Sequence, residues 1–253
     1  MIFTRLAKFF SILIVLVILS LFLFAARFVS YSVLVETLTN SFFLASVMFS
    51  ISTAFYATMV SLVLGIPVGY TLARSKLKFW RVIEICFDLP LVLPPLIIGV
   101  LLLITLNSPL IKNFYTFVFT PAGAVIAQIL IGMPLTIKSA KTAFQLISPI
   151  YERVAMTLGA RPIKSFYDTT FKMAFPGILG GLILTWLRCI GEFGATLMIG
   201  GGIPGRTVNV PINIYLNMSS GDFNIGITSS LLMVIFSFLC IVFIRTIIFN
   251  KTR

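Results

Sequence analysis

Two oppositely charged residues, Arg188 and Glu192, stand four positions apart within a strongly apolar part of the chain. Side chains four residues apart meet on one face of an α-helix. Because a charge at the centre of a bilayer costs about 2.5–3.5 kcal/mol, neither of them should face lipid. Two roles remain open: an ion pair that locks a helix bundle, or a position on a translocation path where Arg188 offsets part of the desolvation cost of a dianion.

The sequence contains no set of residues typical of an enzyme active site. Histidine is absent, which removes the commonest metal ligand and general base. Cys86, Cys189 and Cys240 lack a CxxC spacing, so we expect small buried side chains rather than disulfide partners or metal ligands. HExxH, GxGD and GxSxG motifs are also missing. We therefore predict no catalytic residue, no metal site and no cofactor bound by this chain, and an intramembrane enzyme is an unfavoured alternative.

A polar stretch, residues 151–177, interrupts the apolar sequence. It carries six of the 26 (19 + 7) charged side chains: Glu152, Arg153, Arg161, Lys164, Asp168 and Lys172. Just before it, Ser148 followed by Pro149 is typical of a helix start. Gly159 suits the left-handed position that ends a helix, and Arg161–Pro162 starts the chain again. We predict two short amphipathic helices joined at a glycine elbow.

The two predicted helices have an apolar face and small residues at their junction. The apolar positions recur at helical spacing: Ile150, Val154, Leu158, Ile163, Phe166, Tyr167 and Phe171. Glu152 and Arg153 are expected to turn away from that face. Ala155, Gly159 and Ala160 leave room for another protein to approach. Two roles stay open here, a helix pair resting on lipid or a docking element for a soluble partner.

This stretch also contains GARPIKS (159–165), which partly matches a Walker A phosphate-binding loop. It lacks the second glycine, and its lysine comes one position early. Nucleotide chemistry is therefore expected on another chain.

The composition places the polypeptide in a membrane. Of 253 residues, 59% are apolar and 10% are charged, with a mean hydropathy of +1.10, whereas soluble domains carry about 25% charged residues. Uncharged runs predict six transmembrane helices near residues 9–26, 41–72, 82–111, 122–147, 177–200 and 225–249. A signal peptide is the alternative for the first, but its apolar core is long for one. The expected fold class is an all-α, multi-pass protein of the cell membrane.

Basic residues set the predicted orientation, since they concentrate on the cytoplasmic side. With a cytoplasmic N-terminus, 15 of the 19 Lys and Arg lie inside: Arg5, Lys8, Arg74, Lys76, Lys78, Arg81, Lys138, Lys141, Arg153, Arg161, Lys164, Lys172, Arg245, Lys251 and Arg253. Both termini and the segment 151–177 are therefore predicted to be cytoplasmic. This distribution explains the net charge of +12 without a nucleic-acid partner.

The elbow segment resembles the EAA loop of the permease subunits of type I ABC importers, whose pattern is E-A-A-x3-G-x9-I-x-L-P. Ala155 and Gly159 occupy the second alanine and the glycine. The glutamate position holds Arg153, with Glu152 one residue early, and the first alanine is Val154. Downstream, the I, L and P positions hold other residues: Thr169, Phe171 and Lys172.

A second block, RCIGEFGATLMIGGGIPGRTVNVPINIY (188–215), resembles the same region of molybdate and tungstate transporter permeases. The matching features are GEFGAT, IPG-x-T and the later P-x-x-x-Y. Overall the resemblance covers about residues 40–245. Relatives that carry sulfate or thiosulfate share parts of this block, so the sulfate/thiosulfate importer permease is the alternative within the family.

The resemblance implies the parts of the machine and where they meet. It implies a homodimer of permease chains, two ABC ATPase subunits that hold ATP and Mg, and an extracytoplasmic oxyanion-binding protein. Residues 1–35 would form an N-terminal helix and a short external loop, and residues 36–250 the transporter domain with its cytoplasmic coupling loop 148–172. The coupling residues are expected to be Glu152, Arg153, Ala155, Gly159 and Ala160.

A translocation path for a tetrahedral oxyanion would be lined by weakly binding donors. The candidates are Arg188, Glu192, Gly194 and Thr196, although close helix packing is the commoner role of such glycines. The external stretch 201–224 is polar and rich in turns, so Arg206, Thr207 and Asn213 are candidate contacts for the binding protein. A stand-alone anion channel is the remaining alternative, and it gives no reason for the glycine elbow.

Overall fold

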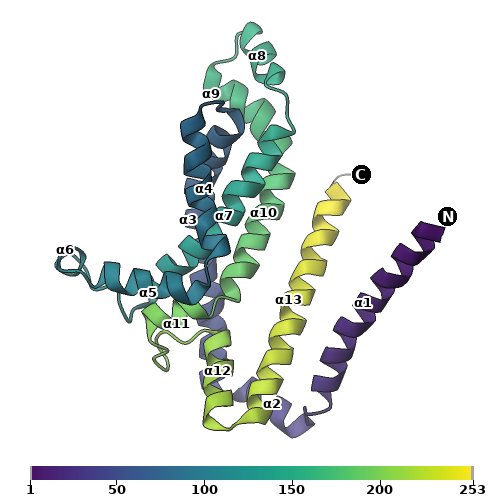
Figure 1. Cartoon of the computed structure of the whole chain (residues 1–253), viewed down its shortest axis with the longest axis vertical. Helices are drawn as coiled ribbons and strands as arrows, with labels where there is room; N and C mark the ends of the chain where they lie inside the picture. The colour runs from purple at the N-terminus through teal and green to yellow at the C-terminus, as the bar shows by residue number, and fades with distance from the viewer. Residues whose placement is uncertain (1, 252–253) are drawn as a thin grey trace.

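The computed structural model describes residues 2–251, which form helices and connecting turns without any strand (Figure 1). Arg253, counted above as cytoplasmic, lies outside the described residues, as do the side chains of Arg245 and Lys251. Five stretches are long and apolar enough to cross a membrane. They lie in α1 (Ile2–Ala26), α3 (Ser41–Arg74), α7 (Pro121–Gln145), the run Pro162–Ile190, and α13 (Phe223–Lys251). A sixth span results if the bent pair α4–α5 is counted as one, in agreement with the six predicted spans.

The third predicted span is broken into two helices. α4 (Lys78–Val92) and α5 (Pro95–Leu106) meet at 109°. The break falls at Leu93 and Pro94, both extended, because a residue that precedes proline is driven out of the helical region. After the turn, α5 packs on α11 (Gly194–Gly200), where Gly99 lies against Ala195 and Met198. The short α6 (Pro109–Lys112) follows.

The fifth span differs from the predicted helix at 177–200. It starts earlier: α9 (Pro162–Ser165) continues through a π-helical turn (Phe166–Phe171) into α10 (Lys172–Ile190). It also ends earlier, at Ile190, and α11 is a separate helix. The prediction of a separate second helix on the membrane surface was therefore wrong. The rings of Phe166 and Phe171 pack on the bundle instead, so this segment forms the start of the fifth span.

The core of the fold is the group α3, α7 and α10, which stand side by side in Figure 1. Small residues allow the contact: a Cβ added to Gly69 would lie 2.7 Å from the Cβ of Ala140, and one on Gly132 would lie 2.6 Å from the Sγ of Cys189. Buried hydroxyls add polar links, such as Thr136 to Thr185 (Oγ1–Oγ1, 2.8 Å). Close backbone approach and side-chain hydrogen bonds are the usual means of helix association in membranes.

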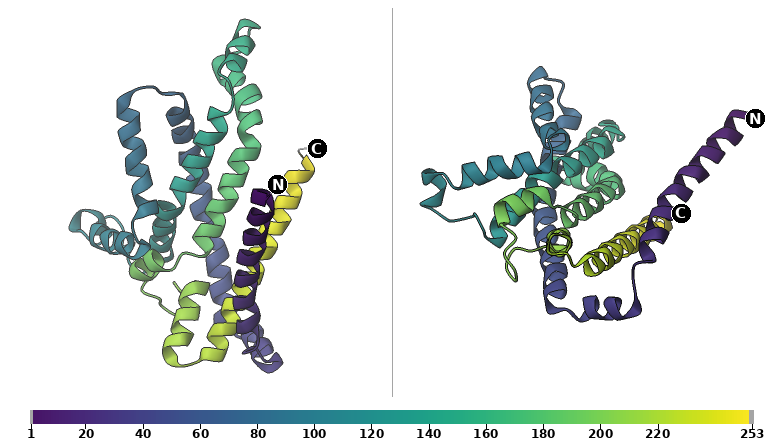
Figure 2. Two further views of the ribbon diagram at one scale, coloured as in Figure 1. Left: turned by 45° about the vertical axis from the view of Figure 1, so that its right-hand side comes forward. Right: turned by 60° about the horizontal axis from the view of Figure 1, so that its bottom comes forward.

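The two ends of the molecule differ in character. α8 (Ile150–Thr157) forms the tip at one end, and α2 (Tyr31–Thr39) and α12 (Val210–Ser220) lie at the other (Figure 1). α1 lies beside α13, apart from the central bundle, and Figure 2 shows the two helices running together toward the chain ends. Both helices point toward the end that carries α8, as the predicted common side of the termini and the elbow segment requires.

Candidate functional site

The elbow closes as predicted. Gly159 has a φ of +91°, in the left-handed region that favours glycine. Its N–H donates to the carbonyl of Met156 at 3.0 Å, and the N–H of Ala160 donates to the carbonyl of Ala155 at 3.0 Å. These bonds end α8 with a sharp turn. An added Cβ on Gly159 would meet nothing within 4 Å, so the turn lies at the surface of the chain.

The apolar side chains of α8, of its C-cap and of the start of α9 point outward. Leu158 is 84% exposed and Ile163 85%, with Ile150 and Val154 each half exposed. Side chains of this size are normally covered when they cluster on a protein surface. The tip of the molecule is therefore an uncovered apolar surface, which we call the α8 tip and define as Ile150, Val154, Leu158 and Ile163.

Glu152 points the other way, into the bundle. Its carboxylate accepts hydrogen bonds from the hydroxyls of Tyr70 (3.0 Å) and Thr170 (2.5 Å), and it lies 3.6 Å from Nη2 of Arg74. Its backbone carbonyl accepts from the hydroxyl of Ser165 at 2.7 Å. One residue of α8 therefore contacts the end of α3, α9 and the π-helical turn.

Arg74 extends this anchor to a further helix. Its Nη1 donates to the carbonyl of Ile147, just past the end of α7, at 2.9 Å. The rings of Tyr70, Phe144 and Phe166 pack beside it, with Tyr70 4.8 Å from Phe166 and 5.2 Å from Phe144. The helix ends of α3 and α7 are thus tied to α8. One sequence signal points to this role, an arginine at the last residue of an apolar span, but it does not identify the partner.

The other coupling candidates lie around the tip. Arg153 is exposed, while Ala155 and Ala160 are half-buried. Only Arg153 among them presents a charge to the outside.

The predicted pair of Arg188 and Glu192 is formed. Nη1 of Arg188 lies 2.6 Å from Oε2 of Glu192. The carboxylate is buried at 1% exposure, whereas the side chain of Arg188 is 36% exposed. Nη1 is thus engaged by the buried carboxylate, while part of the Arg188 side chain reaches the surface of the chain.

Glu192 also organises the break after α10. Its Oε1 accepts from the N–H of Ala195 at 3.0 Å, which caps α11, and its backbone carbonyl accepts from Nδ2 of Asn209 at 2.5 Å. Oδ1 of Asn209 in turn accepts from the N–H of Ile212 at the start of α12. Residue spacing indicated the ion pair, but the capping role depends on a helix break that the pattern did not reveal.

Gly194 and Thr196 lie within packed regions. A Cβ on Gly194 would lie 3.0 Å from the backbone N of Leu96, so this glycine permits contact between α11 and α5. The hydroxyl of Thr196 is buried without a hydrogen-bond partner. Glu192 of the ion pair accepts a hydrogen bond from the backbone N–H of Ala195, which lies between them in the sequence, but the Thr196 hydroxyl does not bond to the pair.

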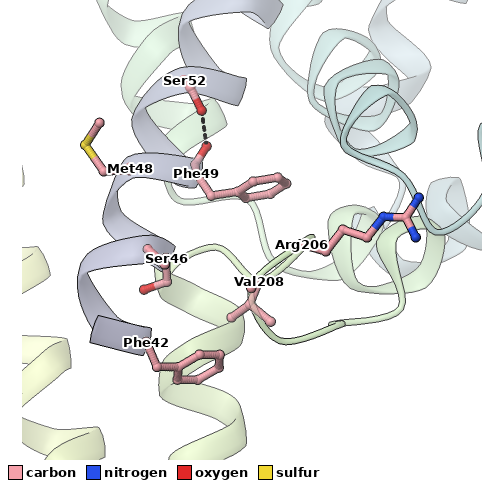
Figure 3. Close-up of a pocket in the computed structure, with 9 residues that line it drawn as sticks. Phe42, Ser46, Met48, Phe49, Ser52, Arg206 and Val208 are labelled. Carbon is pink, nitrogen blue, oxygen red and sulfur yellow. Dashed lines mark hydrogen bonds between the residues drawn. The ribbon is translucent and has the colours of Figure 1, made fainter. Parts of the chain in front are cut away.

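The external candidates divide by exposure. Arg206 is exposed beside a cavity of about 380 Å³ formed by the start of α3 and the 205–208 loop. Figure 3 shows its side chain extending away from Ser46 and Ser52. Thr207 and Asn213 are buried: the Thr207 hydroxyl donates to the Gly200 carbonyl at 2.7 Å and accepts from the Ile203 N–H at 2.9 Å. Thr207 therefore stabilises the 200–207 loop by hydrogen bonds inside it.

Across residues 2–251, no group of three or more Cys, Asp or Glu side chains could hold a metal ion. The cysteines are single: Cys189 is buried, but Cys86 is exposed, contrary to the expectation of a buried thiol. The chemistry of the described residues is that of packing, ion pairing and hydrogen bonding.

Comparisons with known proteins agree with this architecture. YvgM of Bacillus subtilis (strain 168), named for a molybdenum transport system permease protein, is 35% identical over 221 residues, covering 85% of this chain and 97% of YvgM. WtpB of Thermococcus kodakarensis, a molybdate/tungstate transport system permease protein, is 32% identical over 184 residues, covering 73% of this chain and 71% of WtpB.

The fold matches a solved transporter as well. A chain of the MetNI methionine ABC transporter, in an inward facing conformation, superposes with a TM-score of 0.66 at 19% identity, covering 83% of this chain and 96% of that chain. The family described as binding-protein-dependent transport system inner membrane component matches residues 65–252. The chain therefore belongs to the inner membrane components of binding-protein-dependent transport systems.

Proposed function

We propose that this chain is the permease subunit of an ATP-driven importer of molybdate or tungstate. The observation that carries the proposal is the α8 tip, exposed and apolar, yet fixed through Glu152 to the ends of the central spans. An ATPase subunit bound there, holding ATP and Mg, would push on α3 and α10 together. Two permease chains, two ATPase subunits and an external oxyanion-binding protein complete the assembly.

The contacts indicate how a movement would pass inward. A displacement of α8 acts on Arg74 at the end of α3 and on Thr170 in the π-helical turn that opens α10. α3, α7 and α10 pack closely through small residues, so they are expected to move as one unit. Such rigid-body motion of a helix bundle is a common route of alternating access.

Arg188 is the candidate for the path itself. Its partner carboxylate is buried, but its own side chain is 36% exposed. A cation held in place by a buried carboxylate can meet an oxyanion without reorganising, which lowers the cost of moving the anion through a low-dielectric region. The oxyanion would be bound weakly, because one of the two charges of the pair opposes it.

The names of YvgM and WtpB favour molybdate and tungstate over sulfate or thiosulfate. A stand-alone channel would have no use for an anchored α8. We therefore retain the importer as the function that explains both the anchor and the ion pair.

Uptake into liposomes tests the proposal. The chain would be reconstituted with its ATPase and binding protein, and molybdate, tungstate and sulfate uptake measured with and without ATP. We expect ATP-dependent uptake of molybdate or tungstate that stops when the ATPase is omitted. Conduction by the chain alone, or ATP-driven uptake of sulfate only, would refute the proposal.

A further inference from the structure

The charge on the outer surface of α8 and α9 is mostly of one sign. Three exposed basic residues surround the α8 tip: Arg153, Arg161 and Lys164. Only two acidic residues, Glu152 and Asp168, occur between positions 150 and 172. Asp168 pairs with Lys172 at 3.0 Å, one helical turn away.

Glu152 does not neutralise the charge of these exposed basic residues, because its carboxylate points into the bundle. Tyr70, Thr170 and Arg74 surround it, and its side chain is 16% exposed. The residue at the next position, Arg153, faces outward instead. The surface offered to a partner therefore has an apolar centre and a cationic rim.

The position of this surface separates it from the lipid. α1 and α13 have 25 and 29 residues, enough to cross the hydrocarbon layer. α8 lies beyond both helices at the extreme end of the molecule (Figure 1), and the turned view in Figure 2 agrees. The rim therefore projects past the membrane surface that those helices define, into the aqueous side where a soluble subunit binds.

We propose that the basic rim of Arg153, Arg161 and Lys164 pairs with carboxylates of the ATPase subunit, arranged around an apolar floor that receives the α8 tip. The proposal rests on the proposed function, since the ATPase is its occupant. Apolar contact supplies most of the affinity, and opposite charges at the rim set orientation and association rate.

Charge reversal tests the proposal. The purified chain would be placed in nanodiscs of neutral lipid and its affinity for its ATPase measured over a range of salt concentrations. We expect the double variant Arg153→Glu/Lys164→Glu to bind about tenfold more weakly, the sum of two surface charge pairs reversed. Wild-type binding should weaken as salt rises, and the variant should lose that dependence.

The controls separate charge from folding. Arg5→Glu makes the same kind of charge change on α1, far from α8 (Figure 1), and should leave the affinity unchanged. Thermal unfolding of each variant checks that it is folded. ATPase variants selected for binding to the double variant should replace an Asp or Glu by Lys or Arg.

Each failure has a distinct meaning. If the wild-type chain does not bind the ATPase at all, the proposed function itself fails. If it binds but charge reversal has no effect on affinity, the proposed pairing of the basic rim with ATPase carboxylates is refuted, while the proposed function stands. The same pairing is refuted if charge reversal abolishes only a preference for vesicles of anionic lipid, because the basic rim would then bind lipid headgroups rather than the ATPase.

Discussion

At the scale of single residues, two glutamates, Glu152 and Glu192, have similar roles in different places. Each has a largely buried carboxylate, one partner arginine and at least one neutral donor. A charge in such a site is stable only while its partners stay, since removing one partner of a buried pair costs about 3–5 kcal/mol. Both residues therefore fix the position of the elements around them.

The spacing of Arg188 and Glu192 was sufficient to predict their contact, because it depends on one helical turn alone. The bonds of Glu192 to Ala195 and Asn209 could not be predicted. They require the chain to leave the helix at Gly191, which depends on the packing between α11 and α5. The helical pattern also placed Glu152 and Arg153 on the same side of α8. It could not predict that Arg153 points outward while Glu152 points into the bundle.

Arg188→Gln tests the role of the partly exposed arginine side chain. We expect transport per assembled complex to fall about tenfold, a change of about 1.4 kcal/mol in the barrier, because the oxyanion loses its cation. Assembly with the ATPase should persist, and Arg188→Lys should restore part of the rate. Vesicle uptake normalised to complex measured by gel filtration gives the result. Lost assembly with unchanged transport per folded complex would show a purely structural pair.

At the scale of elements, packing between distant helices explains where the predicted helices failed. Six spans could be counted from uncharged runs, and Pro94–Pro95 indicates a break in the third of them. The 109° angle of that break could not be predicted, because α5 turns to bury Ile98 against α11 and α7. The continuation of α9 into α10 was also missed. The helix does begin at Pro162, but Thr170, bonded to Glu152, and Phe166, packed on Tyr70, hold it against the bundle, so it runs on into α10.

Gly159 allows a test of the elbow. Gly159→Val places a β-branched residue at φ +91°, which costs roughly 1–3 kcal/mol of backbone strain and should weaken ATPase binding as α8 shifts. Gly180→Ala is the matched control, since its added Cβ also meets nothing within 4 Å but its backbone is helical. Thermal unfolding and ATPase affinity would be measured for both. Equal behaviour of the two variants would show that the left-handed turn is dispensable.

At the scale of the whole molecule, the topology predicted from the distribution of basic residues agrees with the structure. α8 and the chain ends reached by α1 and α13 lie toward the same side, opposite α2 and α12 (Figure 1). The apolar surface between α1 and α13, lined by residues such as Phe22 and Phe238, suits lipid or a neighbouring membrane helix. The rigid connection from α8 to the bundle was beyond prediction from the sequence, because it joins residues up to 82 positions apart.

The α8 tip is the place where we expect an ATPase subunit to act on this membrane bundle. A photo-activated crosslinker at Leu158 in intact cells tests this directly when compared with one at Leu110 in α6, which lies away from α8 (Figure 1), since both side chains are more than 80% exposed. We predict a crosslink from Leu158 to an ATPase subunit and none from Leu110. Failure of Leu158 to reach another polypeptide, or its labelling by an impermeant reagent from outside the cell, would show that the tip is not the docking surface.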